Sequence, residues 1–315
     1  TLLLLSGDGT WEHPYSPVDI IWSTQIDASQ EVAVAGYYVG FPGSSTDNAL
    51  ASKLEATAMA LSTVTEGVSV ANTIPAQVHA NLREGTTIEA NLGQWVIITG
   101  KKATYFSKPG IKNSSVTQKL ALGTIDISSD GYATRYSAIP TIVPEGMKAG
   151  LVTVTEENKL LIDYCYGEGD VIPALTGVIL AAQEGTYPQV FVAANTTVPT
   201  NNCLYGSLVD QETQAPQEET EYSFYAFTRQ NETLGFFWAA ENGAAFTNKA
   251  GEAYLAIPKS ETLQNGFSVN DLETGISNQE MSVTHQRATY DLQGRRVMRP
   301  SQGIYVQDGV LRLIK

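Results

Sequence analysis

The chain has 315 residues, 43% of them hydrophobic, which is long for one core and ample for two. Its 19 Lys and Arg against 33 Asp and Glu give a net charge of −14. From residue 281 onward six basic and two acidic residues make the segment +4, so the remainder is about −18 by subtraction. An acidic body without a basic stripe excludes nucleic acid as an expected partner. No run of 18 apolar residues occurs, so we expect no transmembrane segment.

Residues 1–120 predict a small β-domain. Runs at 32–39 and 95–98 have strand composition, whereas 48–61 and the weaker 87–92 have helical composition. A glycine-kinked strand and about five strands fit a small closed barrel. Strand parity separates Tyr38 from Tyr37, so at least one of the two faces away from the core.

The same segment carries an ordered set of motifs: Gly7-Asp8-Gly9-Thr10, Pro14-Tyr15, Asp19-Ile20-Ile21, a glycine-bounded strand at 36–40, Asn91-Leu92-Gly93 and the stretch 105–112. This order resembles an OB-fold-like domain of exported Bacteroidetes proteins. The resemblance implies an OB-fold-like β-barrel over 1–120, and it departs from the family's pattern at 49–71.

Residues 121–264 read as short strands separated by turn dipeptides such as Asp130-Gly131 and Asn242-Gly243, which is typical of a β-sandwich. Gly131-Tyr132-Ala133-Thr134 and Thr176-Gly177-Val178 are among the marks that resemble a β-rich module of large surface proteins in the same bacteria. The polar stretch 265–280 predicts a linker. The expected fold class is therefore all-β, an OB-like barrel followed by a β-sandwich-type module and a short β tail.

Residues 281–315 predict three short strands separated by turns, the last turn being Asp308-Gly309. Their spacing resembles a type IX-like C-terminal sorting tail, carried by Tyr290, Leu292, Gly294, Val297, Gly303, Ile304 and Tyr305. The resemblance implies a secreted or outer-membrane cell-surface protein that is recognised by export machinery through this tail.

Residues for catalysis or metal binding are scattered. His13, His79 and His285 fall one in each segment, and no zinc-protease, nucleophile-elbow, P-loop or EF-hand motif occurs. The acid pair Glu168 and Asp170 fits either a solvated turn or a weak Ca²⁺ site. Other acid clusters are read as solvated loops in preference to glycosidase carboxylates. We therefore expect no catalytic residues, metal or cofactor. Cys165 and Cys203 are either free thiols or one disulfide.

Aromatic residues are the best candidates for ligand contact. Tyr37, Tyr105 and Phe106 fit an exposed stacking platform on the barrel, and the alternative is that these rings pack the barrel and its loops. We expect a non-enzymatic exported surface protein that acts as an adhesive, scaffolding or ligand-presenting unit, with a surface glycan or protein as its ligand. The alternative is a carbohydrate-binding module, or less favourably an oligonucleotide-binding one, and a degenerate hydrolase ranks last.

Overall fold

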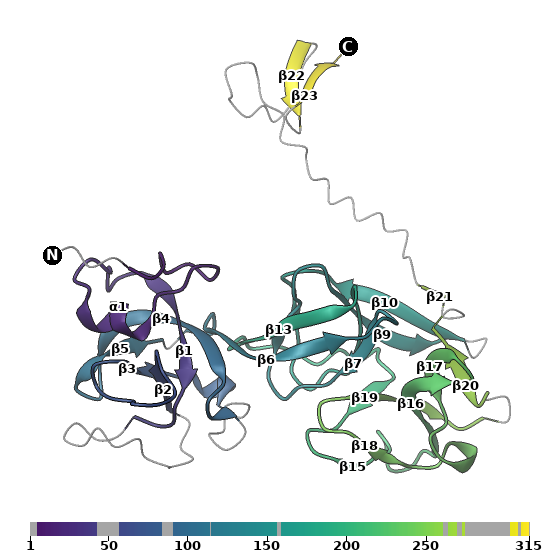
Figure 1. The fold of residues 1–315 in the computed structure, drawn as a ribbon. Coiled ribbons are helices and arrows are strands. Elements are labelled where there is room, and N and C mark those ends of the chain that lie inside the picture. Colours follow the sequence, from purple (N-terminus) through teal and green to yellow (C-terminus); the bar gives the residue numbers. More distant parts are fainter. Residues whose placement is uncertain are drawn as a thin grey trace. The chain divides into compact units, whose positions relative to one another are not determined.

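The computed structural model describes residues 5–42, 57–83, 91–113, 115–155, 159–260, 264–269, 273–274, 303–307 and 310–314. Strands dominate these residues, so the expected all-β fold is confirmed (Figure 1). The chain divides into two compact units, residues 1–274 and residues 275–315. Among the described residues, no helix has the length and apolarity needed to span a membrane.

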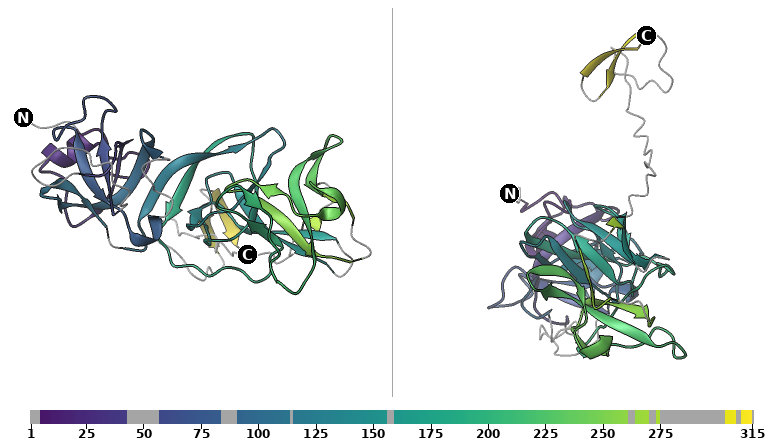
Figure 2. Two further views of the ribbon diagram at one scale, coloured as in Figure 1. Left: turned by 90° about the horizontal axis from the view of Figure 1, so that it is seen from below. Right: turned by 90° about the vertical axis from the view of Figure 1, so that its right-hand side faces the viewer.

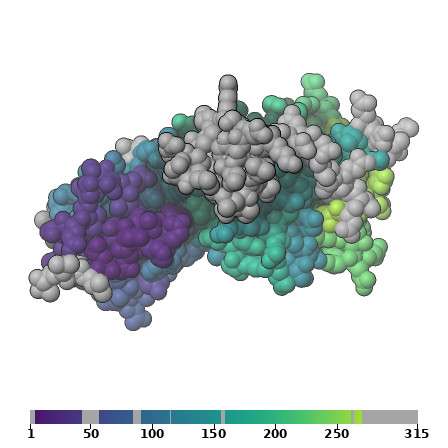
Figure 3. Space-filling model, turned by 90° about the horizontal axis from the view of Figure 1, so that it is seen from above, coloured from purple at the N-terminus to yellow at the C-terminus, as the bar shows by residue number. Residues whose placement is uncertain are grey.

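The first unit opens with a short helix, α1 (Pro17–Trp22). Ser16 caps it and Pro17 starts it, and the side chains of Ser16 and Asp19 form a capping box. The Asp19 carboxylate is 3% exposed. It accepts hydrogen bonds from the Ser16 N–H and the Ser16 hydroxyl, both at 2.8 Å, and from the backbone and hydroxyl of Ser6. The N-terminal segment, drawn in purple, lies at the surface (Figure 3).

Five strands close into a barrel in the order β1-β2-β3-β5-β4 and back to β1. Neighbours pair antiparallel except β3 and β5, which are parallel at Ala76 and Ile111. Gly110 permits this closure, because an added Cβ there would lie 2.4 Å from the Pro75 carbonyl oxygen. The strands are β1 (Glu31–Tyr38), β2 (Ala58–Ser62), β3 (Thr73–Gln77), β4 (Trp95–Tyr105) and β5 (Lys108–Lys112).

The prediction of a helix over 48–61 is wrong for the part of that range that the structure describes. Residues 48–56 lie outside the described residues, and residues 58–61 belong to β2. Every residue of β2 is buried, between β1 and β3, so tertiary pairing overrides the helical propensity of Ala, Met and Leu. Of the helix expected at 87–92, residues 87–90 are outside the described residues. Helix α1 was not expected, although the sequence carries its signals, a serine cap followed by a proline.

Strands β6 (Lys119–Ile127) and β13 (Gly185–Val192) join the barrel to the rest of the first unit (Figures 1 and 2). β6 pairs with β4 of the barrel at one end and with β13 along its length. The barrel core also includes Leu122 of β6 and, from farther along the chain, Ile139, Phe191 and Ala193. The boundary expected after residue 120 thus falls inside β6, and the later chain contributes to the barrel core.

Beyond the barrel, sheets stack face to face. The middle sheet has the order β21-β10-β9-β12-β7, and it packs on the sheet β14-β19-β16-β17-β20 through a core that includes Val152, Leu204 and Tyr225. Its other face packs on the far end of the nine-stranded barrel sheet through a second core that includes Met147 and Leu180. This is a β-sandwich arrangement. The elements are β7 (Tyr132–Arg135), β8 (Thr141–Ile142), β9 (Lys148–Val154), β10 (Leu160–Tyr166), β11 (Val171–Ile172), β12 (Val178–Ala181), β14 (Leu204–Gly206), β15 (Gln211–Glu212), β16 (Tyr222–Gln230), β17 (Thr233–Phe237), β18 (Thr247–Asn248), β19 (Ala253–Pro258), β20 (Gly266–Ser268) and β21 (Glu273–Thr274).

The segment expected as a linker, 265–280, contains β20 and β21, and both pair with strands of the first unit. In the second unit, β22 (Gly303–Gln307) and β23 (Val310–Ile314) form an antiparallel hairpin in which Gln307 lies opposite Val310. The turn expected at Asp308-Gly309 lies outside the described residues. The strand expected around Tyr290 and Val297 lies outside the described residues.

Candidate ligand-binding site

The connection between β4 and β5 is a two-residue hairpin turn with an unusual sequence. Tyr105 lies opposite Lys108, so Phe106 and Ser107 are the two central residues. Their φ angles are 48° and 59°, the left-handed region that a type I′ turn requires. Asn-Gly or Asp-Gly usually occupies such turns, because side chains strain there. A bulky aromatic residue at this position violates the local rule, and such violations concentrate at binding sites.

Phe106 is the centre of a ring cluster, which we call the tip cluster: Phe41, Tyr105 and Phe106 with the ammonium group of Lys112. The ring centroids of Phe106 and Tyr105 are 4.5 Å apart, and those of Phe106 and Phe41 are 5.7 Å apart at 79°. Lys112 Nζ lies 5.2 Å from the Tyr105 ring centroid, a cation–π contact. All three rings are half-buried. The cluster therefore presents partly exposed ring surface beside one positive charge.

The Tyr105 hydroxyl reaches the barrel wall. It donates a long hydrogen bond of 3.4 Å to the Thr57 carbonyl oxygen. Burial raises the pKa of Tyr105, so the hydroxyl is neutral at physiological pH. The ring is thus held at both ends, by the hydroxyl and by Phe106, which reduces the entropy lost when a ligand binds against it.

The structure brings together Tyr105 and Phe106 of the expected platform but not Tyr37. Tyr37 lies opposite Trp95, the first residue of β4, with ring centroids 4.9 Å apart at 77°. Trp95 and Tyr105 are the two ends of β4, about 30 Å apart along an extended strand. Tyr38 is fully buried and Tyr37 is not, as strand parity predicted. Trp95, which is 53% exposed, and Phe41 were not among the expected site residues, although both are aromatic.

The residues that the structure describes include the acid pair Glu168 and Asp170 and both cysteines. Within them, no three His, Cys, Asp or Glu side chains gather as a metal site does. The carboxylates of Glu168 and Asp170 accept hydrogen bonds from the backbone N–H of Gly146 and Gly167 in the turns around them. Cys165 and Cys203 are free thiols, and burial raises the pKa of both.

Residues 19–120 match one protein family, described as "Domain of unknown function (DUF6359)". The match covers all five barrel strands and hence the tip cluster. Neither a curated protein nor a solved structure matches the chain. The matched residues end within β6, before the residues that complete the barrel core.

Proposed function

We propose that this protein is a non-enzymatic cell-surface protein that acts in adhesion by binding a carbohydrate through the tip cluster of its OB-like barrel. The observation that carries the proposal is Phe106, a large aromatic side chain kept at a strained hairpin position where glycine or asparagine is favoured. OB barrels bind oligosaccharides and oligonucleotides with one face and its loops. Export to the surface rests on the resemblance of residues 290–305 to a sorting tail.

Carbohydrate is favoured over an oligonucleotide by charge. The chain carries a net −14, which opposes a polyphosphate, and Lys112 is already placed over the Tyr105 ring. Stacking on aromatic rings needs no ion pair, and a ring of the tip cluster contributes about 1–3 kcal/mol if it stacks as rings do in single-strand-binding proteins. A scaffolding role, in which the rings only pack, is the competing function.

The proposal is tested by screening the full chain on a glycan array that includes neutral and acidic glycans, followed by calorimetry on a hit. Tyr105→Ala and Phe106→Ala should each weaken binding by about fivefold to a hundredfold. Ser107→Gly is the matched control in the same turn, because it relaxes the φ of 59° and leaves every ring in place. It should bind as the natural chain does.

The variant Trp95→Ala tests which end of β4 holds the binding site. Unchanged binding in this variant, with loss in Phe106→Ala, supports the tip cluster. Binding that depends on Trp95 but not on Phe106 moves the site to the other end of the strand. No glycan bound by the natural chain leaves scaffolding as the function.

A further inference from the structure

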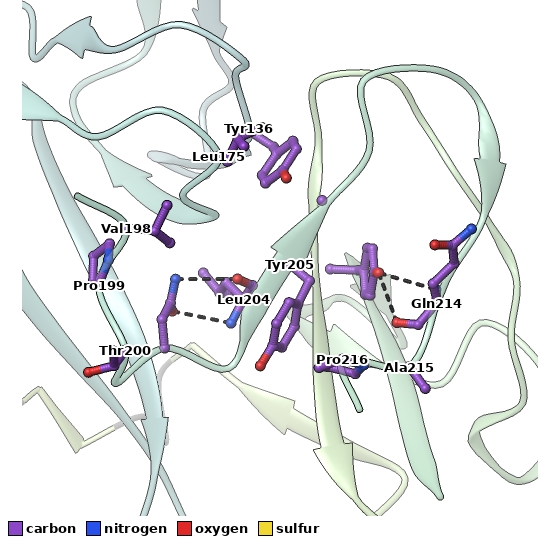
Figure 4. Close-up of a pocket in the computed structure, with 13 residues that line it drawn as sticks. Tyr136, Leu175, Val198, Pro199, Thr200, Leu204, Tyr205, Gln214, Ala215 and Pro216 are labelled. Atoms are coloured by element: carbon purple, nitrogen blue, oxygen red, sulfur yellow. Dashed lines mark hydrogen bonds between the residues drawn. The ribbon is translucent and has the colours of Figure 1, made fainter. Parts of the chain in front are cut away.

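A cavity of about 270 Å³ opens in the β-sandwich beside β14 and is separate from the tip cluster (Figure 4). Three tyrosines, Tyr136, Tyr205 and Tyr254, line it, and we call it the tyrosine pocket. Tyr205 on β14 lies opposite Tyr254 on β19, with ring centroids 6.4 Å apart. Tyr136 packs against Gly206, where an added Cβ would lie 2.2 Å from its ring. Packing therefore fixes the rings before any ligand arrives.

Some polar groups in the lining hydrogen-bond to other protein groups, and others do not; we call the latter the unused groups. The Tyr254 hydroxyl donates to the Gln214 carbonyl oxygen and accepts from the Gln214 N–H, both at 3.2 Å. The Asn202 amide is occupied by backbone groups of residues 152, 177 and 204. Within the residues that the structure describes, no partner is found for the hydroxyls of Tyr136, Tyr205 and Thr200 or the side-chain amide of Gln214. Such a set of neutral donors and acceptors is suited to a ligand rich in hydroxyl groups.

The pocket is electrically neutral. Its lining contains no Asp, Glu, Lys, Arg or His. Burial raises the pKa of all three tyrosines, so their hydroxyls keep their protons at physiological pH. A charged ligand would be partly desolvated here with no opposite charge to compensate, so an uncharged one is favoured.

An apolar lip borders the pocket. Leu175 and Val198 are each 48% exposed although both are large and apolar. Leu175 has a φ of 56°, a left-handed conformation that is unfavourable for a residue other than glycine. Its N–H donates a 2.7 Å hydrogen bond to the Ser137 carbonyl oxygen, which holds the strained backbone in place. Strain of this kind at a pocket rim is typical of ligand clamps.

We propose that the tyrosine pocket binds one neutral sugar residue. A pyranose ring offers an apolar face to a tyrosine ring and hydroxyls that both donate and accept, which match the four unused groups. The cavity is slightly smaller than the ~300–1,000 Å³ of sites for drug-sized molecules, which fits a single ring. A proline-rich peptide also suits aromatic grooves, but proline residues offer acceptors without donors and match the unused groups less well.

The test uses saturation-transfer NMR and calorimetry on the full chain, with galactose, glucose, mannose, fucose and N-acetylglucosamine as probes. Glucuronate and a proline-rich peptide are the comparison ligands. Tyr205→Phe and Tyr136→Phe keep each ring and remove one hydroxyl, so each should weaken binding of the neutral sugar about threefold to tenfold. Tyr205→Ala should abolish it. Tyr187→Phe, whose hydroxyl donates to the Gln183 carbonyl oxygen outside the pocket, is the control and should bind normally.

The variant Phe106→Ala is measured alongside, so that a failure of the tyrosine-pocket proposal can be distinguished from a failure of the tip-cluster proposal. Sugar binding lost in the Tyr205 variants and kept in Phe106→Ala supports the tyrosine pocket. Binding that survives Tyr205→Ala, or binding of the peptide without any sugar, overturns the proposal. Binding of none of the five sugars to the natural chain overturns it as well, and leaves the tip cluster unaffected.

Discussion

At the scale of single residues, Asp19 shows how a buried charge is retained. Burial alone would raise its pKa, but hydrogen bonds from Ser6 and Ser16 outweigh burial and hold the pKa below its usual range. A lowered folded-state pKa adds stability above the unfolded pKa, and this stability is lost as the pH falls through the folded value. The capping box at the start of α1 is therefore sensitive to acid.

The free energy of unfolding should decrease as the pH drops below about 4, where an unperturbed aspartate titrates. Asp19→Asn should lower it by about 1–3 kcal/mol at neutral pH and flatten the acid limb. Urea unfolding from pH 2.5 to 7 measures both effects. Glu145→Gln, at an exposed position, is the control, and it should change the free energy of unfolding little at pH 7. An acid limb of unchanged slope in Asp19→Asn would show that other groups cause the acid sensitivity.

The candidate rings could be found from sequence, but their grouping could not. Tyr105 and Phe106 are adjacent in the chain, so their proximity follows from the hairpin. Phe41 reaches Phe106 only because the barrel closes, and Tyr37 meets Trp95 only through the β1–β4 register. Such long-range contacts depend on strand pairing that local patterns do not specify.

At the scale of elements, β13 fills a gap in the barrel core. Phe191 is 7% exposed and belongs to the same core as Val96 and Leu120. Phe191→Ala should lower the free energy of unfolding by about 3–5 kcal/mol, because a large side chain is lost from a packed interior. Denaturant unfolding followed by tryptophan fluorescence measures it. Val209→Ala, at a position 61% exposed, should change it by less than about 0.5 kcal/mol. An equally small effect of Phe191→Ala would mean that the barrel does not need β13.

In residues 121–264, backbone conformation at the glycine-containing dipeptides was easier to predict from sequence than the partner with which each strand pairs. Asp130-Gly131 does lie in a turn, with a φ of 78° at Gly131, whereas Asn242-Gly243 lies in the short 3-10 helix η2 (Glu241–Gly243), with a left-handed φ of 54° at Asn242. These dipeptides act through local backbone sterics, which sequence reveals directly. The error at β2 has the opposite origin, since its five residues are strand only because β1 and β3 bury them.

At the scale of the whole molecule, residues 1–274 form a compact unit, and the sorting-like tail falls in the other unit. Deleting residues 281–315 should leave the thermal unfolding midpoint of the remainder within about 3 °C, because residues before 275 supply the hydrophobic cores that the structure describes for the first unit. It should abolish display on the surface of the native host, because the tail is the proposed export signal. Surface proteolysis and cell fractionation measure display. A truncated protein that still reaches the surface would refute the sorting role.

The paired strands β6 and β13 also have a mechanical consequence. Both backbones pass from the barrel into the sandwich, and seven residue pairs join them, including Phe191 with Leu120 near the barrel. A force that pulls the barrel away from the sandwich is therefore shared by the backbones of both strands. Bending the junction requires breaking the hydrogen bonds that pair β6 with β13. If the barrel holds a ligand under flow, tension reaches the sandwich without first unravelling a flexible tether.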